Sequence, residues 1–292
     1  MTVIVPVAPG GPSDLVARAW SEKLTTQFGK PFVVDNRPGA SQVIGTQAVA
    51  KAEADGHVLL QAASSMSINA VTMEKLPYDT IKDFTPISLT HMTPLVVVVP
   101  AQGPIKSIAD LVRLAKVDPG QISYGTTGDG SSQQLAMLLL AQRAGLEQLT
   151  EVRYKGSSQA HPDLISGRLS VMIDPVAAVA VHIKAGTLRA LAVTTSSRIS
   201  ALPDTPTVGE SGYPGYEVVS WGGVFAPAST PKRVVDQLQA GIATALNAPE
   251  MQARFEQWGV VAKPSSSEAF GLFVKAEIVK WRGVLKPQFS KQ

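Results

Sequence analysis

The sequence predicts an α/β protein of two domains, each a mixed, mostly parallel sheet flanked by helices. Three observations support this fold class. Strand-like and helical segments alternate along most of the 292 residues, which is typical of parallel sheets. The alternation begins at the N-terminus and begins again near residue 107. Two further strand-like segments, 95–100 and 218–226, separate the two sets.

The first set begins with a short buried strand, Val3–Val7. Apolar residues at helical spacing then predict a helix that ends near Phe28. The remaining elements of this set are a strand at Phe32–Val34, a turn at Asn36–Gly39, a helix at about Val43–Ala52 and a strand at His57–Gln61.

The second set begins with a capping box, Ser107 with Asp110, which opens a helix. Its other elements are a strand at Ile122–Tyr124, a helix to Ala144, a strand at Glu151–Tyr154, a helix to about Gly167, a strand at Leu169–Ile173, a helix at Val176–Ala185 and a strand at Leu188–Val193. After a loop rich in proline and glycine, the tail is predicted to be a strand at Tyr216–Phe225 and helices at Pro231–Leu246, Pro249–Trp258 and Ser265–Leu285. Ser265 with Glu268 is read as a second capping box.

We interpret 95–100 as the crossing out of the first domain and 218–226 as the return. Domain 1 then comprises residues 1–98 and 224–292, and domain 2 comprises residues 99–223. Two crossings make a hinge, and a cleft between hinged domains is a common place for a ligand.

Composition excludes several classes of protein. Apolar residues make up 45% and charged residues 17% of the chain, as in a globular protein. The net charge of +3 is not gathered into a basic block, which argues against nucleic acid and suits a small anionic ligand. With no cysteine, disulfides, thiol nucleophiles and cysteine-ligated metals are excluded. No apolar run approaches the ~20 residues of a membrane-spanning helix.

Two glycine-rich segments are the main candidates for ligand binding. Each is expected between a strand and a helix, where backbone amides approach a ligand closely and the helix N-terminus favours an anion. The candidate residues are Pro9, Gly10, Gly11, Pro12 and Asp14 in the first segment, and Thr126, Gly128, Ser131, Ser132 and Gln134 in the second. An ordinary turn, with Ser13 or Asp14 capping the helix, is an equally good reading of the first segment alone. Two such turns, one in each domain, could clamp an anion from both sides.

Polar residues at other strand ends extend this set. Ser64 and Ser65 follow the strand His57–Gln61, where they could bind a carboxylate or cap the next helix. Tyr154 and Asp174 lie at strand ends of the second domain. Asp174 could orient a ligand group or cap the helix after Pro175, and we give these two interpretations equal weight. The turn Asn36–Ala40 is read as structural.

The sequence offers little for catalysis. The four histidines are scattered without metal-ligand spacing, and no Gly-x-Ser-x-Gly motif is present. We therefore expect no catalytic residue, no metal and no cofactor. An enzyme acting on a carboxylic acid, with Asp174 or Tyr154 as acid or base, is the alternative. A carboxylate sensor that signals to a membrane partner is another.

The segments, in this order along essentially the whole chain, resemble the substrate-binding proteins of the tripartite tricarboxylate transporter systems, the Bug family. The residues that carry the resemblance are Val5–Gly11 with Ser13–Asp14, Asn36–Ala40 with Ile44–Gly45, Asp55–Gly56, Leu76–Asp79 with Lys82–Phe84, Tyr154–Ser157, Ile183–Gly186 with Leu188–Val193, Leu202–Asp204 with Pro206–Val208, and Phe225–Pro227.

The resemblance implies a periplasmic receptor of the Venus flytrap type, like the type II periplasmic binding proteins. It implies a small carboxylate ligand (a di- or tricarboxylate, an amino acid or an aromatic acid) and delivery to membrane transporter subunits, without membrane insertion. In that family backbone amides, hydroxyls and waters hold the carboxylate. Met1 is followed at once by a strand-like segment, so a periplasmic location would require that a leader has been removed.

Three departures from the family pattern concern the ligand. Ser41 and Gln42 replace a Gly-Gly pair, Gln134 and Leu138 stand where a His and a Glu are usual, and Ser170 replaces an Asp. Gln134 lies one helical turn past the second glycine-rich segment, so it bears on which ligand is bound.

Overall fold

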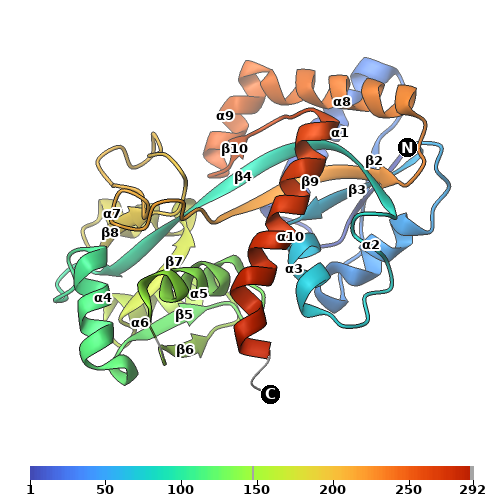
Figure 1. The fold of residues 1–292 in the computed structure, drawn as a ribbon. Helices are drawn as coiled ribbons and strands as arrows, with labels where there is room; N and C mark the ends of the chain where they lie inside the picture. The colour runs from blue at the N-terminus through green and yellow to red at the C-terminus, as the bar shows by residue number, and fades with distance from the viewer. Residues whose placement is uncertain (147, 290–292) are drawn as a thin grey trace. The chain divides into compact units, whose positions relative to one another are not determined.

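The computed structural model of the protein describes residues 1–146 and 148–289 (Figure 1). The chain forms two compact units. Unit 1 is Met1–Met92 with Trp221–Gln292, and unit 2 is Thr93–Ser220. The chain passes between the units within two strands, β4 (Phe84–Pro100) and β9 (Val219–Pro227). The domain limits expected from the sequence, 98/99 and 223/224, fall a few residues further along these two strands.

Unit 1 is built on a sheet with the strand order β2-β1-β3-β9-β4, and β10 pairs with β4. Besides β4 and β9 its elements are β1 (Thr2–Val5), α1 (Pro12–Phe28), β2 (Val33–Asn36), η1 (Ala40–Gln42), α2 (Val43–Ala50), β3 (Val58–Ala63), α3 (Ser65–Thr72), α8 (Lys232–Asn247), α9 (Pro249–Gln257), β10 (Val261–Ala262) and α10 (Ser267–Phe289). β1 is parallel to both of its neighbours, with Thr2 opposite Val33 of β2 and Val58 of β3.

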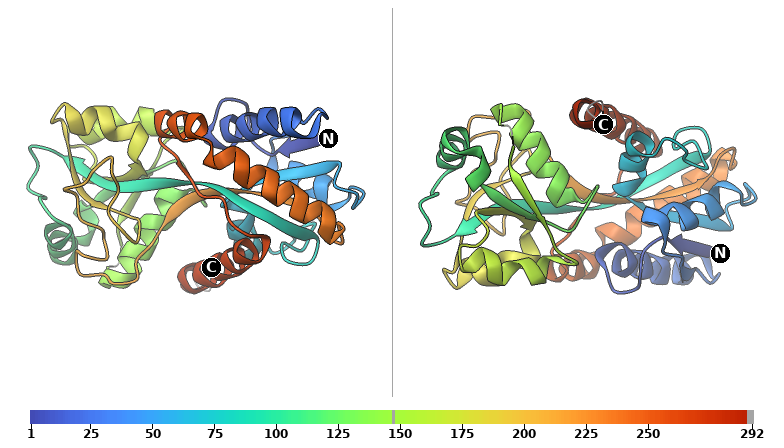
Figure 2. Two further views of the ribbon diagram at one scale, coloured as in Figure 1. Left: turned by 90° about the horizontal axis from the view of Figure 1, so that it is seen from above. Right: turned by 90° about the horizontal axis from the view of Figure 1, so that it is seen from below.

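Helices cover both faces of the sheet of unit 1. Alternate residues of each strand point to opposite faces, so they pack in different cores. Val3 and Val5 pack with α1 and α8, for example against Trp20 and Ile242. Ile4, between them, packs in a separate core with Phe270 of α10. Figure 2 shows α1 and α8 on one side of this sheet and α10 on the other.

A buried polar network lies inside unit 1. Gln61 accepts a hydrogen bond from Trp20 Nε1 at 2.9 Å and donates to Thr90 Oγ1 at 3.2 Å. The hydroxyl of Thr90 also lies 3.1 Å from Nδ1 of His91. Burial lowers the pKa of His91 to about 4, so this imidazole is neutral at pH 7. A Cβ at Gly222 would overlap the ring of His91, which explains the glycine at that position.

Unit 2 has the sheet β4-β7-β5-β6, and β8 pairs with the other edge of β4. Its remaining elements are α4 (Ile108–Val117), η2 (Pro119–Gln121), β5 (Ser123–Thr126), α5 (Ser132–Ala144), β6 (Thr150–Arg153), α6 (Ser157–Ile165), β7 (Val171–Pro175), α7 (Val176–Lys184) and β8 (Leu188–Val193). β5 is parallel to both β6 and β7. Leu164 of α6 and Val179 of α7 share one core with Val96 and Met172 of the sheet.

The structure differs from the sequence-based expectation in two elements. β4 begins at Phe84, eleven residues before Leu95, and it continues through Pro86 and Pro94 with residues 87–91 all buried. The capping box at Ser265 is wrong: Ser265 Oγ accepts from Leu89 N, and Ser266 Oγ accepts from Ala269 N at the start of α10. At α4 the cap is confirmed, since Ser107 Oγ accepts from Asp110 N at 3.0 Å.

Candidate functional site

The two glycine-rich segments occupy equivalent places in the two units. The first follows β1, the middle of three parallel strands, and the second follows β5, which is also the middle of three. From each middle strand the chain crosses first to one neighbouring strand and then to the other: from β1 to β2 and on to β3, and from β5 to β6 and on to β7. Right-handed crossovers then place successive helices on opposite faces, and open α/β sheets bind ligands at the carboxyl end of the strand between them.

In unit 1, the first segment faces open space. A Cβ at Gly10 or Gly11 would meet no atom within 4 Å, and Gly10 has a φ of 93° that favours glycine. No side chain caps α1 at Gly11, so the capping reading of Ser13 or Asp14 is wrong. Pro12 has no amide proton and Asp14 N donates to Gly11 O. Among the described residues, the amide of Ser13 is therefore the first-turn donor left for a ligand.

The carboxylate of Asp14 binds the segment internally. It is 2% exposed and accepts hydrogen bonds from Gly10 N at 2.9 Å, Arg18 Nε at 3.1 Å and Asn36 Nδ2 at 2.9 Å. Burial raises the pKa of Asp14, but the bonds from Arg18, Gly10 and Asn36 outweigh burial and leave the pKa below its ordinary value. Asp14 therefore holds the loop and is not presented to a ligand.

The neighbouring turn after β2 has an unusual backbone. Ala40, Ser41 and Gln42 have φ values of 46°, 52° and 76°, a left-handed conformation that costs roughly 1–2 kcal/mol for each residue with a side chain. Asn69 Nδ2 of α3 donates to Ser41 O at 2.8 Å and holds this turn in place. Arg37 pairs with Asp35 at 2.8 Å on the surface.

Ser64 and Ser65 lie at the carboxyl end of β3, next to β1. No side chain caps the N-terminus of α3, so the reading of these serines as caps is wrong. Ser65 Oγ is buried and has no hydrogen-bond partner among the described residues. Ser64 N donates to Trp221 O at 3.0 Å.

In unit 2, the second segment joins β5 to α5. Gly128 and Gly130 have φ values of 103° and 73°, and a Cβ at Gly128 would meet no atom within 4 Å. Ser131 caps α5, its Oγ accepting from Gln134 N at 3.3 Å. The amides of Ser132 and Gln133 in the first turn have no acceptor among the described residues, so they are the donors that could bind an anion.

The side chain of Gln134 is directed into the protein. It is 9% exposed, its Oε1 accepts from Gly130 N at 2.8 Å, and its Nε2 donates to Glu151 Oε1 at 3.0 Å. Thr126 Oγ1 donates to the same carboxylate oxygen at 2.7 Å and accepts from Gly128 N at 3.1 Å. Hydrogen bonds of the Gln134 side chain thus connect Gly130 of the second segment to Glu151 of β6.

Asp174 is fully buried at the end of β7. Its carboxylate accepts from Ser157 Oγ at 2.6 Å and Gln133 Nε2 at 3.3 Å, and lies 2.8 Å from His161 Nε2. No side chain caps α7, so the capping reading of Asp174 is wrong. Asp174 is 0% exposed, and Gln133, which donates to it, also accepts from Thr127 Oγ1 of the second segment at 3.2 Å.

Tyr154 is also bonded within unit 2. Its hydroxyl donates to Asp163 Oδ2 of α6 at 2.8 Å, and Arg168 pairs with the other oxygen of Asp163 at 2.8 Å. Burial and the bond to Asp163 raise the pKa of Tyr154. A neutral phenol bonded to a carboxylate is a poor general base, which argues against an acid–base role for Tyr154.

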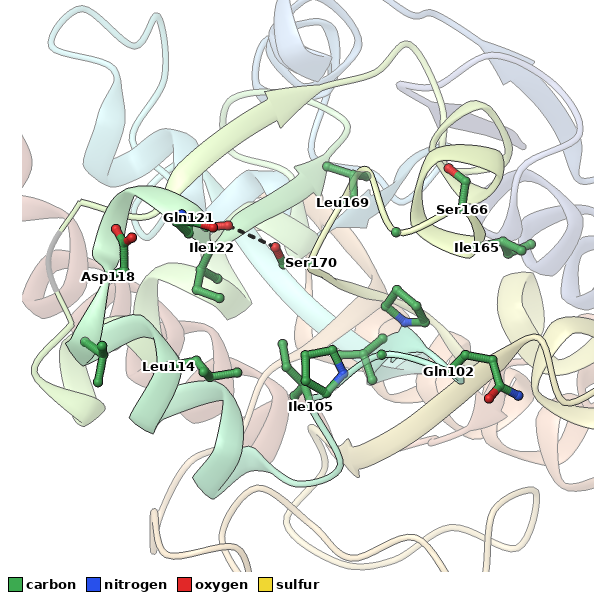
Figure 3. Close-up of a pocket in the computed structure, with 16 residues that line it drawn as sticks. Gln102, Ile105, Leu114, Asp118, Gln121, Ile122, Ile165, Ser166, Leu169 and Ser170 are labelled. Carbon is green, nitrogen blue, oxygen red and sulfur yellow. Dashed lines mark hydrogen bonds between the residues drawn. The ribbon is translucent and has the colours of Figure 1, made fainter.

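A cavity of about 630 Å³ lies elsewhere in unit 2 (Figure 3). It is lined by residues before β5 and β7, such as Ile122 and Leu169, and by the end of β4, so it is at the opposite edge of the sheet from the second segment. Asp118 is the one ionisable side chain among its described lining residues. A cavity with this lining has no cation or helix N-terminus for a carboxylate.

No group of three His, Cys, Asp or Glu side chains in residues 1–146 and 148–289 is placed to hold a metal ion. Within the same residues, every helix is too short or too polar to span a bilayer.

Comparison with known proteins identifies the family. A model of the tripartite tricarboxylate transporter family receptor matches residues 16–288. The chain belongs to this receptor family. The structure of the periplasmic binding protein BugD is similar to this receptor with a TM-score of 0.78 and 33% identity, over 98% of this chain and 96% of BugD. The resemblance to the Bug family and the two-domain fold of periplasmic binding proteins are thereby confirmed.

Two structures similar to this receptor contain a dicarboxylate. Rpa4515 of R. palustris, solved with adipate, has a TM-score of 0.81 and 34% identity, over 98% of this chain and 96% of that protein. MatC of Rhodopseudomonas palustris, solved with malate, has a TM-score of 0.78 and 28% identity, over 98% of both chains. Receptors that resemble this one therefore bind small carboxylates.

Sequence analysis missed the groups that hold the loops of this receptor. It did not single out Glu151, Gln133, Asn36 or Arg18 as site residues, although each contacts a loop residue. Glu151 and Arg153 flank Val152 on the edge strand β6, and such an alternation signals a polar face. It does not show which element that face contacts.

Proposed function

We propose that this receptor binds a small dicarboxylate through the two glycine-rich loops, 9–14 and 125–132, with the serines at the end of β3. The observation that carries the proposal is the position of both loops at the carboxyl end of the middle parallel strand in their units. Each loop offers first-turn amides without an acceptor, and amides at a helix N-terminus favour an anion.

The donors that we assign to the ligand are neutral. They are the amides of Ser13, Ser132 and Gln133, with the hydroxyl of Ser65. Charge-assisted bonds contribute roughly 1.5–3 kcal/mol each. A handful of them suits a micromolar dissociation constant, which corresponds to about 8 kcal/mol.

The adipate and malate of the two similar structures support a dicarboxylate of four to six carbons. Membership of the receptor family supports delivery to membrane transporter subunits and a periplasmic location. We propose that the ligand leaves chemically unaltered, since Asp174 and Tyr154, the residues considered for acid–base roles, are bonded within unit 2.

A calorimetric titration with adipate and with malate tests the proposal. We expect a dissociation constant in the micromolar range for at least one of them. The methyl diesters, which lack the charge, should not bind. NMR of the ligand after overnight incubation should show the starting compound. Equal affinity for acid and diester, or conversion of the acid, would contradict the proposal.

A further inference from the structure

The carboxylate of Glu151 lies directly behind the second glycine-rich loop. Its side chain is 18% exposed and comes from β6, the neighbour of β5. Oε1 accepts from Thr126 Oγ1 at 2.7 Å and from Gln134 Nε2 at 3.0 Å, and Oε2 accepts from Gln134 Nε2 at 3.2 Å and Arg153 Nη2 at 3.2 Å. These bonds occupy the acceptor positions of a carboxylate.

Two of the three side chains that donate to Glu151, Thr126 and Gln134, also accept an amide proton from the loop. Thr126 Oγ1 accepts from Gly128 N at 3.1 Å, and Gln134 Oε1 accepts from Gly130 N at 2.8 Å. The hydroxyl proton of Thr126 points to Glu151, which leaves its lone pair for Gly128. The NH2 group of Gln134 points to Glu151, which turns its carbonyl oxygen to Gly130. The carboxylate of Glu151 thus orients both acceptors, and for Gln134 it is assisted by Asp129 Oδ1, which also accepts from Nε2 at 3.1 Å.

The glycines held in this way have left-handed backbones. Gly128 and Gly130 have φ values of 103° and 73°, and they precede the Ser132 and Gln133 amides by a few residues. A loop of this kind has many accessible conformations unless bonds select one. In unit 1, a carboxylate holds the loop directly, since Asp14 accepts from Gly10 N.

We infer that Glu151 is the positioning residue of the second ligand-binding loop, acting through Thr126 and Gln134 without touching the ligand. The inference rests on the proposed function for its effect on affinity, but not for its effect on the loop. It also gives Gln134 a role: this residue transmits the position of Glu151 to Gly130 and is not itself a ligand contact.

The central variant is Glu151→Gln, which keeps size but removes one acceptor oxygen. We expect amide hydrogen exchange of Gly128 and Gly130 in the ligand-free protein to accelerate about tenfold or more, and adipate binding to weaken by about tenfold, the effect of losing roughly one hydrogen bond. The matched control is Glu210→Gln. Glu210 also accepts a backbone amide, Thr207 N at 2.7 Å, and pairs with an arginine in unit 2, away from the loop.

A rescue variant separates positioning from general damage. The rescue variant combines Gln134→Glu and Glu151→Gln, which exchanges the carboxylate and the amide, with Asp129→Asn, because Asp129 Oδ1 accepts from Gln134 Nε2 at 3.1 Å and would repel a carboxylate at position 134. The new carboxylate at position 134 can accept from Gly130 N and from the new amide, whose oxygen can accept from Thr126. We expect both glycine exchange rates and adipate affinity to return to within about threefold of wild type, a change of less than one ordinary hydrogen bond.

The outcomes distinguish this inference from the proposed function. Wild-type exchange rates at Gly128 and Gly130 in Glu151→Gln would overturn the positioning role, whatever the protein binds. Accelerated exchange without recovery in the rescue variant would overturn it as well. If the wild type binds neither adipate nor malate while the glycine rates respond as expected, the proposed ligand fails and the positioning role stands.

Discussion

The amide of Gly10 donates a 2.9 Å hydrogen bond to the carboxylate of Asp14, four residues further along the chain. This bond closes the first glycine-rich loop on itself. It also means that the acidic residue nearest the proposed anion site is neutralised by its own loop and by Arg18. A negative side chain beside an anion site is therefore compatible with anion binding.

Asp14→Asn should destabilise unit 1 at neutral pH. The pKa of Asp14 is lowered in the folded protein, so its carboxylate stabilises the fold above the unfolded-state pKa, and this contribution is lost as the pH falls through the folded-state pKa. We expect the variant to lose about 1–3 kcal/mol of unfolding free energy at pH 7 and much less in acid. Urea denaturation at several pH values measures this. The exposed Asp204→Asn is the control, and a pH-independent loss would contradict the role given to Asp14.

Gly11→Asp should abolish carboxylate binding without unfolding the protein. The backbone of Gly11 has a φ of −80° and a Cβ there meets no atom within 4 Å, so a side chain is accommodated. The added negative charge would lie beside the Ser13 amide and repel the ligand. Adipate titration of Gly11→Asp and of the isosteric, neutral Gly11→Asn separates charge from bulk. Equal affinities in the two variants would show that charge at this loop is irrelevant.

Ser131→Asp tests the loop of unit 2 in the same way. Aspartate is as good an N-cap as serine, so the bond to Gln134 N is retained and the melting temperature should stay near that of wild type. Ser131→Ala should instead lose about 1 kcal/mol of stability by removing the cap. We expect Ser131→Asp to lose adipate binding and Ser131→Ala to keep most of it. If only one of the variants Gly11→Asp and Ser131→Asp lost adipate binding and the other kept wild-type affinity, the two loops would not share a ligand.

His91 should make unit 1 less stable in mild acid. Its pKa is about 4 in the folded protein, whereas an unfolded histidine has a pKa of about 6.5. Between these values the unfolded state binds the proton and the folded state does not, so stability falls as the pH falls from 7 toward 4. This difference between the two pKa values corresponds to a loss of about 2 kcal/mol of unfolding free energy between pH 7 and pH 5. Urea denaturation of His91→Gln should lack this pH-dependent part.

The control for His91 is His57→Gln. The side chain of His57 is 69% exposed and pairs with Asp55 on the surface. This variant should keep the wild-type fall in stability between pH 7 and pH 5. An unchanged pH dependence in His91→Gln would contradict the neutral, buried state of His91.

The positions of the loops were predictable from the sequence, and their internal bonding was not. Alternation of strands and helices placed Gly10–Gly11 and Gly128–Ser131 after parallel strands, because the periodicity of buried residues is local, although β5 continues through Gly125 and Thr126. The role of Gln134, on α5, depends on Glu151, which is 17 residues away in sequence and on β6. Contacts of this kind depend on register and side-chain direction, which a single sequence does not reveal.

The same limit explains the errors at Asp174 and Ser265. Both residues stand close to a helix start, where a short polar side chain is usually a cap. Asp174 instead meets Ser157 and His161 from α6, and Ser265 meets Leu89 of β4. Tertiary partners outcompeted the local motif in each case.

The internal closure of the first loop by Asp14 has a consequence for the speed of recognition. Because the loop is ordered in the free protein, an arriving dicarboxylate does not have to wait for a rare loop conformation. Association should then follow a single, concentration-proportional phase with little sensitivity to solvent viscosity beyond that of diffusion. Selectivity among acids of different length would appear in the dissociation rate instead.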